Sequence, residues 1–223
     1  MAGRFLAFLL LCSLVPLSAL AADPSASAGR LERIGSPGTC SATLIRPDIA
    51  VTAAHCANPE GLRLGDAPQM FFRPAWPLDA APLAVVEAVR HPLYAPARDG
   101  QLWRFPFDLA LVRVARALPE RVNPPLVEGA APEPGDIVTL MTWRAGHDRP
   151  VLRDCQVVPA VPNLVTVDCE VHGGESGGAV LRMRDGRTEI VAVLTSRARI
   201  GELPVGQASA LDLRLEPMLR RLD

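Results

Sequence analysis

The stretch most suited to chemistry is residues 173–178, which read Gly-Gly-Glu-Ser-Gly-Gly and place Ser176 among glycines. Glycine permits backbone conformations and close approaches that a Cβ atom would prevent. A serine in such a loop can present its hydroxyl while neighbouring backbone N–H groups point at the same place. Acyl transfer needs this combination of nucleophile and oxyanion site. The stretch alone also fits a flexible polar turn, so the chemistry depends on partner residues.

A serine hydroxyl needs a base within hydrogen-bond reach and a third group that orients this base. Among the four histidines, His55 follows an apolar run at residues 51–54 and precedes Cys56, which favours a rigid position. Asp108 stands before the apolar run at residues 109–112, where an unpaired charge would be costly. Each residue also has a structural interpretation: His55 as a partly buried histidine and Asp108 as a turn or cap.

The other three histidines are weaker candidates for the base. His91 precedes Pro92, which favours an extended turn, and we interpret it as structural. His147 lies in a polar loop and is expected to be solvated. His172 is close to Ser176 in sequence and can line a cleft, but that closeness does not make it the base.

The order of these residues separates two hydrolase folds. The nucleophile loop of α/β-hydrolases is followed along the chain by an acid and then a histidine, whereas chymotrypsin-like proteases run histidine, aspartate, serine. No histidine follows Ser176, and the order here is His55, Asp108, Ser176. The α/β-hydrolase interpretation is therefore rejected.

The N-terminus has the features of a secretory signal over residues 1–22. Arg4 supplies a positive region, residues 5–15 are apolar, and the small residues around Ala21 and Ala22 offer a cleavage site. The apolar run is too short to span a membrane. The sequence therefore predicts a secreted or periplasmic protein with no membrane association once the signal is removed.

Four cysteines remain after the signal, and an even count in an exported chain suggests two disulfides. Of three possible connectivities, sequence proximity favours Cys40 with Cys56 and Cys155 with Cys169. Zinc is disfavoured because no Cys-x-x-Cys or His-x-x-x-His pair occurs, and we expect no metal and no cofactor. All 23 basic residues are arginine against 24 acidic residues, and this balance gives no sign of a nucleic-acid partner.

The pattern of apolar residues predicts many short strands and one helix, which suggests barrels or sandwiches. Leu118 to Pro134 is rich in proline and alanine and can join two halves, and residues 151–171 form an expected hairpin that turns near Pro162-Asn163. An apolar stripe predicts a helix at about residues 213–222. The strand-like runs are residues 40–45, 83–86, 109–114, 136–141, 163–168 and 190–194.

Three motifs carry a resemblance to trypsin/chymotrypsin-family serine endopeptidases of the bacterial exported type. They are Thr52-Ala53-Ala54-His55-Cys56, Asp108-Leu109-Ala110-Leu111-Val112 and Gly174-Glu175-Ser176-Gly177-Gly178. The resemblance implies an all-β fold of two six-stranded antiparallel barrels, at about residues 30–120 and 135–212, followed by the C-terminal helix. The Cys40–Cys56 pair resembles the bridge that braces the family's histidine loop.

The resemblance also implies roles. Ser176 would attack a peptide carbonyl, His55 would transfer the proton, and Asp108 would orient His55. The N–H groups of Gly174 and Ser176 would form the oxyanion hole. Substrate contacts would come from the edge strand at Thr195 and Ser196 and from Glu170, at the position of trypsin's pocket acid. Glu170 would favour basic substrate side chains, whereas Arg197 or Arg199 near the edge strand would favour acidic ones. The expected partners are proteins or peptides, bound by a monomer.

One residue departs from the family pattern: Glu175 stands where the family has aspartate. In the trypsin branch that aspartate pairs with a new N-terminal ammonium group after zymogen cleavage. Arg33-Ile34-Gly35 resembles an activation site, but Ile34 is only six positions before Cys40. We therefore hypothesise that no such switch operates and that local contacts form the oxyanion hole. Two alternative functions stay open: an inactive homologue that binds peptides or proteins, and an esterase with the same triad.

Overall fold

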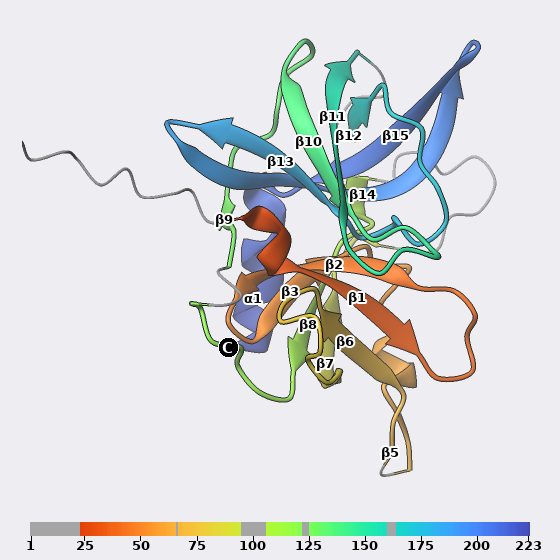
Figure 1. Ribbon diagram of the computed structural model, residues 1–223, viewed down its shortest axis with the longest axis vertical. Helices are drawn as coiled ribbons and strands as arrows, with labels where there is room; N and C mark the ends of the chain where they lie inside the picture. The colour runs from red at the N-terminus through yellow and green to blue at the C-terminus, as the bar shows by residue number, and fades with distance from the viewer. Residues whose placement is uncertain (1–22, 66, 95–105, 122–124, 160–163) are drawn as a thin grey trace, which may run out of the picture.

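The computed structural model describes residues 23–65, 67–94, 106–121, 125–159 and 164–223 (Figure 1). It contains two closed six-stranded antiparallel β-barrels and a C-terminal helix, which confirms the predicted all-β fold. The chain enters the first barrel through a short 3₁₀ helix, η1 (Pro24–Ser27), where the Asp23 carboxylate accepts a hydrogen bond from the amide of Ser25.

The first barrel closes in the strand order β1-β2-β3-β8-β7-β6. A small hairpin of β4 (Arg63–Leu64) and β5 (Ala67–Pro68), preceded by the 3₁₀ helix η2 (Pro59–Gly61), projects from it. The six barrel strands are β1 (Ala28–Arg33), β2 (Cys40–Arg46), β3 (Ile49–Thr52), β6 (Met70–Pro74), β7 (Leu83–Arg90) and β8 (Ala110–Val114).

The second barrel runs in the order β13-β10-β11-β12-β15-β14 and closes through pairing of β13 with β14. In Figure 1 the long hairpin of β14 and β15 projects from the end of this barrel that faces away from the first. The strands are β10 (Ile137–Thr142), β11 (Val151–Val158), β12 (Leu164–Val167), β13 (Ala179–Arg184), β14 (Arg187–Ile200) and β15 (Leu203–Ala210).

Each barrel encloses its own apolar core, and a third cluster joins the two barrels to the helix. Alternation along β6 shows the principle, since Met70 and Phe72 point inward while their neighbours are partly exposed. The joining cluster combines Leu109 of the first barrel, Trp143 of the second and Met218 of α1 (Glu216–Leu222). Apolar burial therefore fixes how the two barrels pack, and this is what positions residues from both barrels around one site.

Both disulfides join the cysteines that sequence proximity favoured, Cys40 with Cys56 and Cys155 with Cys169. The second bridge lies across the antiparallel pair of β11 and β12, which form the expected hairpin. Its expected turn at Pro162-Asn163 lies outside the described residues.

Two expected boundaries differ from the structure. The helix α1 begins at Glu216 instead of residue 213, because the chain first forms a 3₁₀ turn, η4 (Asp212–Arg214), in which Asp212 has a positive φ of 25°. The segment expected as a linker contains a short strand, β9 (Val127–Glu128), that pairs in parallel with β14.

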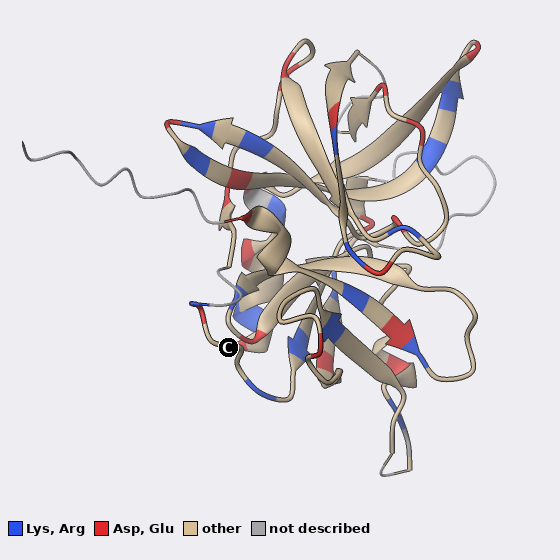
Figure 2. Ribbon diagram, in the orientation of Figure 1, with Lys and Arg blue, Asp and Glu red and all other residues tan. Residues whose placement is uncertain are grey.

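Charged residues are spread over both barrels, with arginine and acidic residues interleaved along several strands (Figure 2). This pattern agrees with the near balance of charge in the sequence. Within the described ranges, no helix is both long enough and apolar enough to cross a membrane.

His91 is a buried structural histidine of the first barrel, and its environment generates a prediction about pH. It is 7% exposed, stacks on Phe107 at 4.9 Å, and its Nδ1 accepts a hydrogen bond from the amide of Leu93. Burial lowers the pKa of His91 from its ordinary value of 6.5, and the nearby charge of Arg214 lowers it further. Protonation would also convert the Nδ1 acceptor into a donor that faces the amide of Leu93.

We expect the free energy of unfolding to decline as the pH falls below about 6.5. The unfolded chain takes up a proton on His91 in that range, whereas the folded chain takes it up only at its lowered pKa. Urea denaturation at pH 7.5 and pH 5.0 measures the decline. His91→Asn keeps an acceptor for Leu93 and should reduce the decline of the unfolding free energy between the two pH values. His147→Asn, at an exposed position, should leave this decline unchanged. An equal decline in His91→Asn and the wild type would contradict the prediction.

Candidate functional site

His55 and Asp108 come together at one end of the first barrel. His55 follows β3 in a turn that the Cys40–Cys56 bridge braces, and Asp108 lies just before β8. The amide of His55 donates to Oδ1 of Asp108 at 2.9 Å, and the ring Nδ1 lies 2.7 Å from Oδ2. Asp108 is 7% exposed, so these bonds offset the cost of burying its charge. A neutral ring that donates from Nδ1 has Nε2 left as a proton acceptor.

Ser176 reaches this pair from the second barrel because Ser41 of β2 binds its loop. The amide of Ser41 donates to the carbonyl of Ser176 at 2.7 Å, and the Ser41 hydroxyl donates to the carbonyl of Gly174 at 3.0 Å. The same hydroxyl accepts from the amide of Trp143 at 2.7 Å. In addition, Sγ of Cys56, the neighbour of His55, lies 3.9 Å from the Ser176 carbonyl oxygen. These contacts hold the loop of Ser176 against β2 and against the turn that carries His55.

The glycine after Ser176 is required by a close approach between the barrels. A Cβ atom on Gly177 would lie 2.1 Å from the Ser41 carbonyl oxygen and 2.2 Å from Oγ1 of Thr52, and its φ is +84°. The loop is also joined to β14, since the amide of Gly177 donates to Leu194 at 2.7 Å and the amide of Leu194 donates to Gly178 at 2.8 Å. Any side chain at Gly177 would separate the serine from His55.

The backbone around Ser176 presents two unpaired amides. Within the described residues, neither the N–H of Gly174 nor that of Ser176 donates to a protein acceptor. Gly174 has a φ of +89°, a left-handed conformation that favours glycine. Within the same residues, no hydrogen bond joins the Ser176 hydroxyl to His55. Contacts of this kind are commonly long without substrate and tighten in the reacting complex.

Glu175 points away from Ser176 into the second barrel, where it is 0% exposed. Nη2 of Arg153 lies 3.0 Å from each of its carboxylate oxygens. Oε1 also accepts from the Thr142 hydroxyl at 3.1 Å, and Oε2 from the amide of His172 at 2.7 Å. A second cation, Arg144, has its Nε 3.8 Å from Oε1. Glu175, the residue that departs from the family motif, therefore has hydrogen-bond or ion-pair partners at both of its carboxylate oxygens.

The expected substrate contacts lie beside this loop. A hollow of about 320 Å³ is lined by Glu170, Val171, Arg197 and Arg199, among others. Glu170 does not lie at a buried base: its side chain is 67% exposed and lies 3.9 Å from His172. Thr195 and Ser196 form the continuation of β14 beyond Leu194, and their hydroxyls bond the carbonyl and side chain of Gln207 at 3.1 and 3.0 Å.

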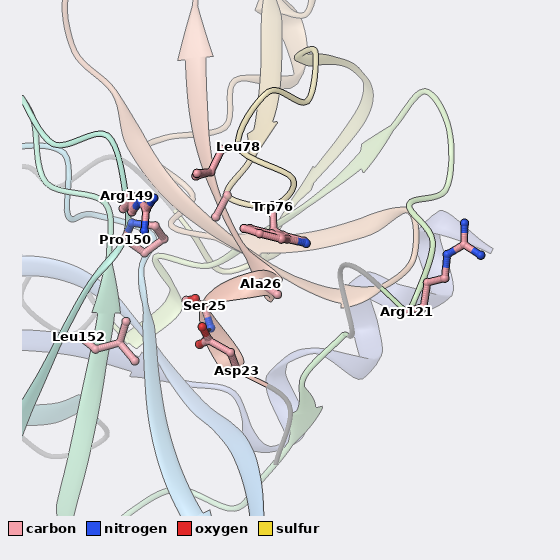
Figure 3. Close-up of a pocket in the computed structure, with 10 residues that line it drawn as sticks. Asp23, Ser25, Ala26, Trp76, Leu78, Arg121, Arg149, Pro150 and Leu152 are labelled. Atoms are coloured by element: carbon pink, nitrogen blue, oxygen red, sulfur yellow. Dashed lines mark hydrogen bonds between the residues drawn. The ribbon is translucent and has the colours of Figure 1, made fainter. Parts of the chain in front are cut away.

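A larger hollow lies elsewhere, between η1, the turn after β6 and the start of β11 (Figure 3). Trp76 and Leu78 line it from the first barrel and Leu152 from the second, and Asp23 and Arg149 also belong to its lining. None of the candidate site residues lines this hollow.

Sequence reasoning missed Ser41 and Arg153, which hold the serine loop from two sides. Both contacts join residues far apart in the chain, so no local pattern reveals them. The only available signal for Arg153 was the glutamate at position 175, because a buried acid requires a compensating partner.

The structure has two six-stranded barrels, a His55–Asp108 pair and a serine flanked by glycines, in the chain order histidine, aspartate, serine. This combination is typical of serine hydrolases with the chymotrypsin-like fold. A family model described as Trypsin matches residues 27–201, well over half of the chain. The chain therefore belongs to the trypsin family of serine peptidases. A search of curated proteins finds no match to the sequence.

Ser41 generates a prediction. Ser41→Ala removes the hydroxyl and leaves the Trp143 amide and the Gly174 carbonyl without their partner, at a buried position. We expect the free energy of unfolding to fall by about 1–3 kcal/mol. Because the Gly174 peptide is then less well fixed, kcat on a peptide substrate should fall by about tenfold. Ser36→Ala, at an exposed turn, is the control and should change neither quantity. An unchanged kcat in Ser41→Ala would contradict the prediction.

Proposed function

We propose that this protein is an active serine endopeptidase that hydrolyses peptide bonds through Ser176, His55 and Asp108. The observation that carries the proposal is the double hydrogen bond of Asp108 to the amide and ring of His55, beside a serine loop with two unpaired amides. A merely structural histidine would not need a buried carboxylate partner, a bracing disulfide and a neighbouring serine loop at the same time.

The proposed reaction proceeds through an acyl-enzyme. Oγ of Ser176 attacks the peptide carbonyl carbon while Nε2 of His55 takes the hydroxyl proton, and Asp108 stabilises the imidazolium that forms. The amides of Gly174 and Ser176 donate to the oxyanion of the tetrahedral intermediate. His55 then gives its proton to the leaving amine, and a water molecule, activated in the same way, releases the acid product. The signal predicted for residues 1–22 and the two disulfides support action outside the cytoplasm.

A fluorophosphonate probe tests this proposal. The wild-type protein should be labelled covalently at Ser176 and should cleave casein, whereas Ser176→Ala should do neither. His55→Ala should lower the labelling rate by at least about 10³-fold. Folded protein that neither labels nor cleaves would instead indicate a peptide-binding homologue. Ester turnover without any peptide cleavage would indicate an esterase.

We infer that substrates carry an acidic side chain before the scissile bond. Of the charged groups that line the hollow at Glu170, Arg199 is paired with Glu202 at 3.1 Å and Glu170 itself lies beside His172. Arg197 has no ion-pair partner within the described part of the chain, and its cation can pair with a substrate carboxylate.

A peptide library measures this preference directly. Peptides with Glu or Asp before the cleaved bond should have the highest kcat/KM, and Arg197→Gln should reduce the advantage of Glu over Gln by about tenfold. Arg199→Gln is the matched control and should have a smaller effect because Arg199 is already paired. A preference for Arg, lost in Glu170→Gln, would assign the selectivity to Glu170 instead.

A further inference from the structure

The buried carboxylate of Glu175 already uses its full hydrogen-bonding capacity within the chain. A carboxylate has about four acceptor sites. Here Oε1 faces Arg153 and the Thr142 hydroxyl, and Oε2 faces Arg153 and the amide of His172. Since Glu175 is 0% exposed, only a permanent cation at this place compensates its charge.

We propose that Arg153 is a positioning residue that holds the oxyanion site in its working form, so that activity needs no cleavage of the chain at Arg33. The proposal rests on the endopeptidase function proposed above. Arg153 lies on β11, opposite Leu140, and so its backbone belongs to the paired sheet of the second barrel. Its guanidinium therefore anchors Glu175, and with it the serine loop, to that sheet.

The path from Arg153 to the oxyanion site is short. The Glu175 carboxylate accepts from the amide of His172 at 2.7 Å, and the Glu175 amide donates back to the His172 carbonyl at 3.3 Å. These two bonds close a turn that contains Gly174, the residue with the unpaired amide. A displacement of the Glu175 side chain would therefore reorient the peptide of Gly174.

The N-terminal segment offers no replacement for Arg153. The amide of Ile34 donates to the Gln69 carbonyl at 3.0 Å, and the Ile34 side chain is 59% exposed at the end of β1. An ammonium group created at Ile34 would have to leave this position, enter the second barrel and displace Arg153 from both carboxylate oxygens. Cys40, six positions after Ile34, is itself fixed by the disulfide, so the residues between them would have to make this relocation alone and would lose the bond to Gln69.

The same geometry accounts for glutamate at position 175. A shorter aspartate would withdraw the carboxylate from Arg153 by one methylene, while the guanidinium would stay fixed by its second bond, from Nη1 to the Glu170 carbonyl at 2.9 Å. The extra methylene of Glu175 therefore lets its carboxylate reach Arg153 on β11.

Steady-state kinetics on a peptide substrate test the positioning role. Arg153→Gln should lower kcat by about 10²-fold, as expected for a damaged oxyanion site, with KM changed by less than about threefold. The rate of fluorophosphonate labelling at Ser176 should fall in parallel. Arg182→Gln is the matched control: Arg182 is another partly buried arginine of the second barrel, paired with Glu189 at 3.3 Å, and its loss should leave kcat within about twofold of the wild type.

Glu175→Asp decides the question if Arg153→Gln does not fold. It keeps the charge and should lower kcat by about tenfold at unchanged KM. Wild-type kcat in either variant, or an equal loss in Arg182→Gln, would overturn the positioning role. Failure of the proposed function is distinguishable, because the wild-type protein itself would then not be labelled at Ser176.

N-terminal sequencing and a variant at Arg33 test separately whether activity needs cleavage of the chain after Arg33. N-terminal sequencing of the labelled wild-type protein should find a chain that begins before Ile34, and Arg33→Gln should be labelled at the wild-type rate. Labelling that occurs only in a chain beginning at Ile34, and never in Arg33→Gln, would overturn this part of the proposal.

Discussion

The hydrogen bonds of Ser41 are the constraint on which the site depends, because they join the two barrels at the serine loop. All the polar groups of this one residue are used: its amide binds the Ser176 carbonyl, its hydroxyl binds Gly174 and Trp143, and its carbonyl accepts from Thr52. Thr52 lies three residues before His55. A single buried residue on β2 thus sets the position of the Ser176 loop relative to His55, and the apolar cluster that joins the barrels packs around this contact.

Two buried acids fix the residues of the candidate site. Asp108 orients His55 through two hydrogen bonds, and Glu175 orients the backbone that precedes the nucleophile. A buried carboxylate tolerates few positions, because the loss of any donor exposes the full cost of its desolvation. The desolvation cost therefore restricts each carboxylate, and the groups bonded to it, to one position. Such preorganisation is the condition for electrostatic stabilisation of a transition state.

The sequence predicted those parts of the fold and site that local patterns encode. Three motifs in chain order predicted His55, Asp108 and Ser176 as one candidate site, and cysteine spacing favoured the two bridges that the structure contains. It could not reveal Arg153, which contacts Glu175 across 22 positions, because an arginine on a half-exposed strand looks like any solvated residue. The parallel pairing of β9 escaped for a related reason: two residues among prolines carry no strand periodicity, and their partner strand fixes their conformation.

Arg153 also connects the serine loop to the hollow that Glu170 lines. One nitrogen of its guanidinium binds the Glu175 carboxylate, and another binds the carbonyl of Glu170 in the wall of this hollow. A planar guanidinium fixes both partners in one geometry, which a flexible ammonium group cannot do. The backbone that lines the hollow and the backbone that carries the unpaired amide of Gly174 are therefore held by one guanidinium. Contacts within the second barrel itself therefore fix this backbone, which is the physical basis of the positioning role proposed for Arg153.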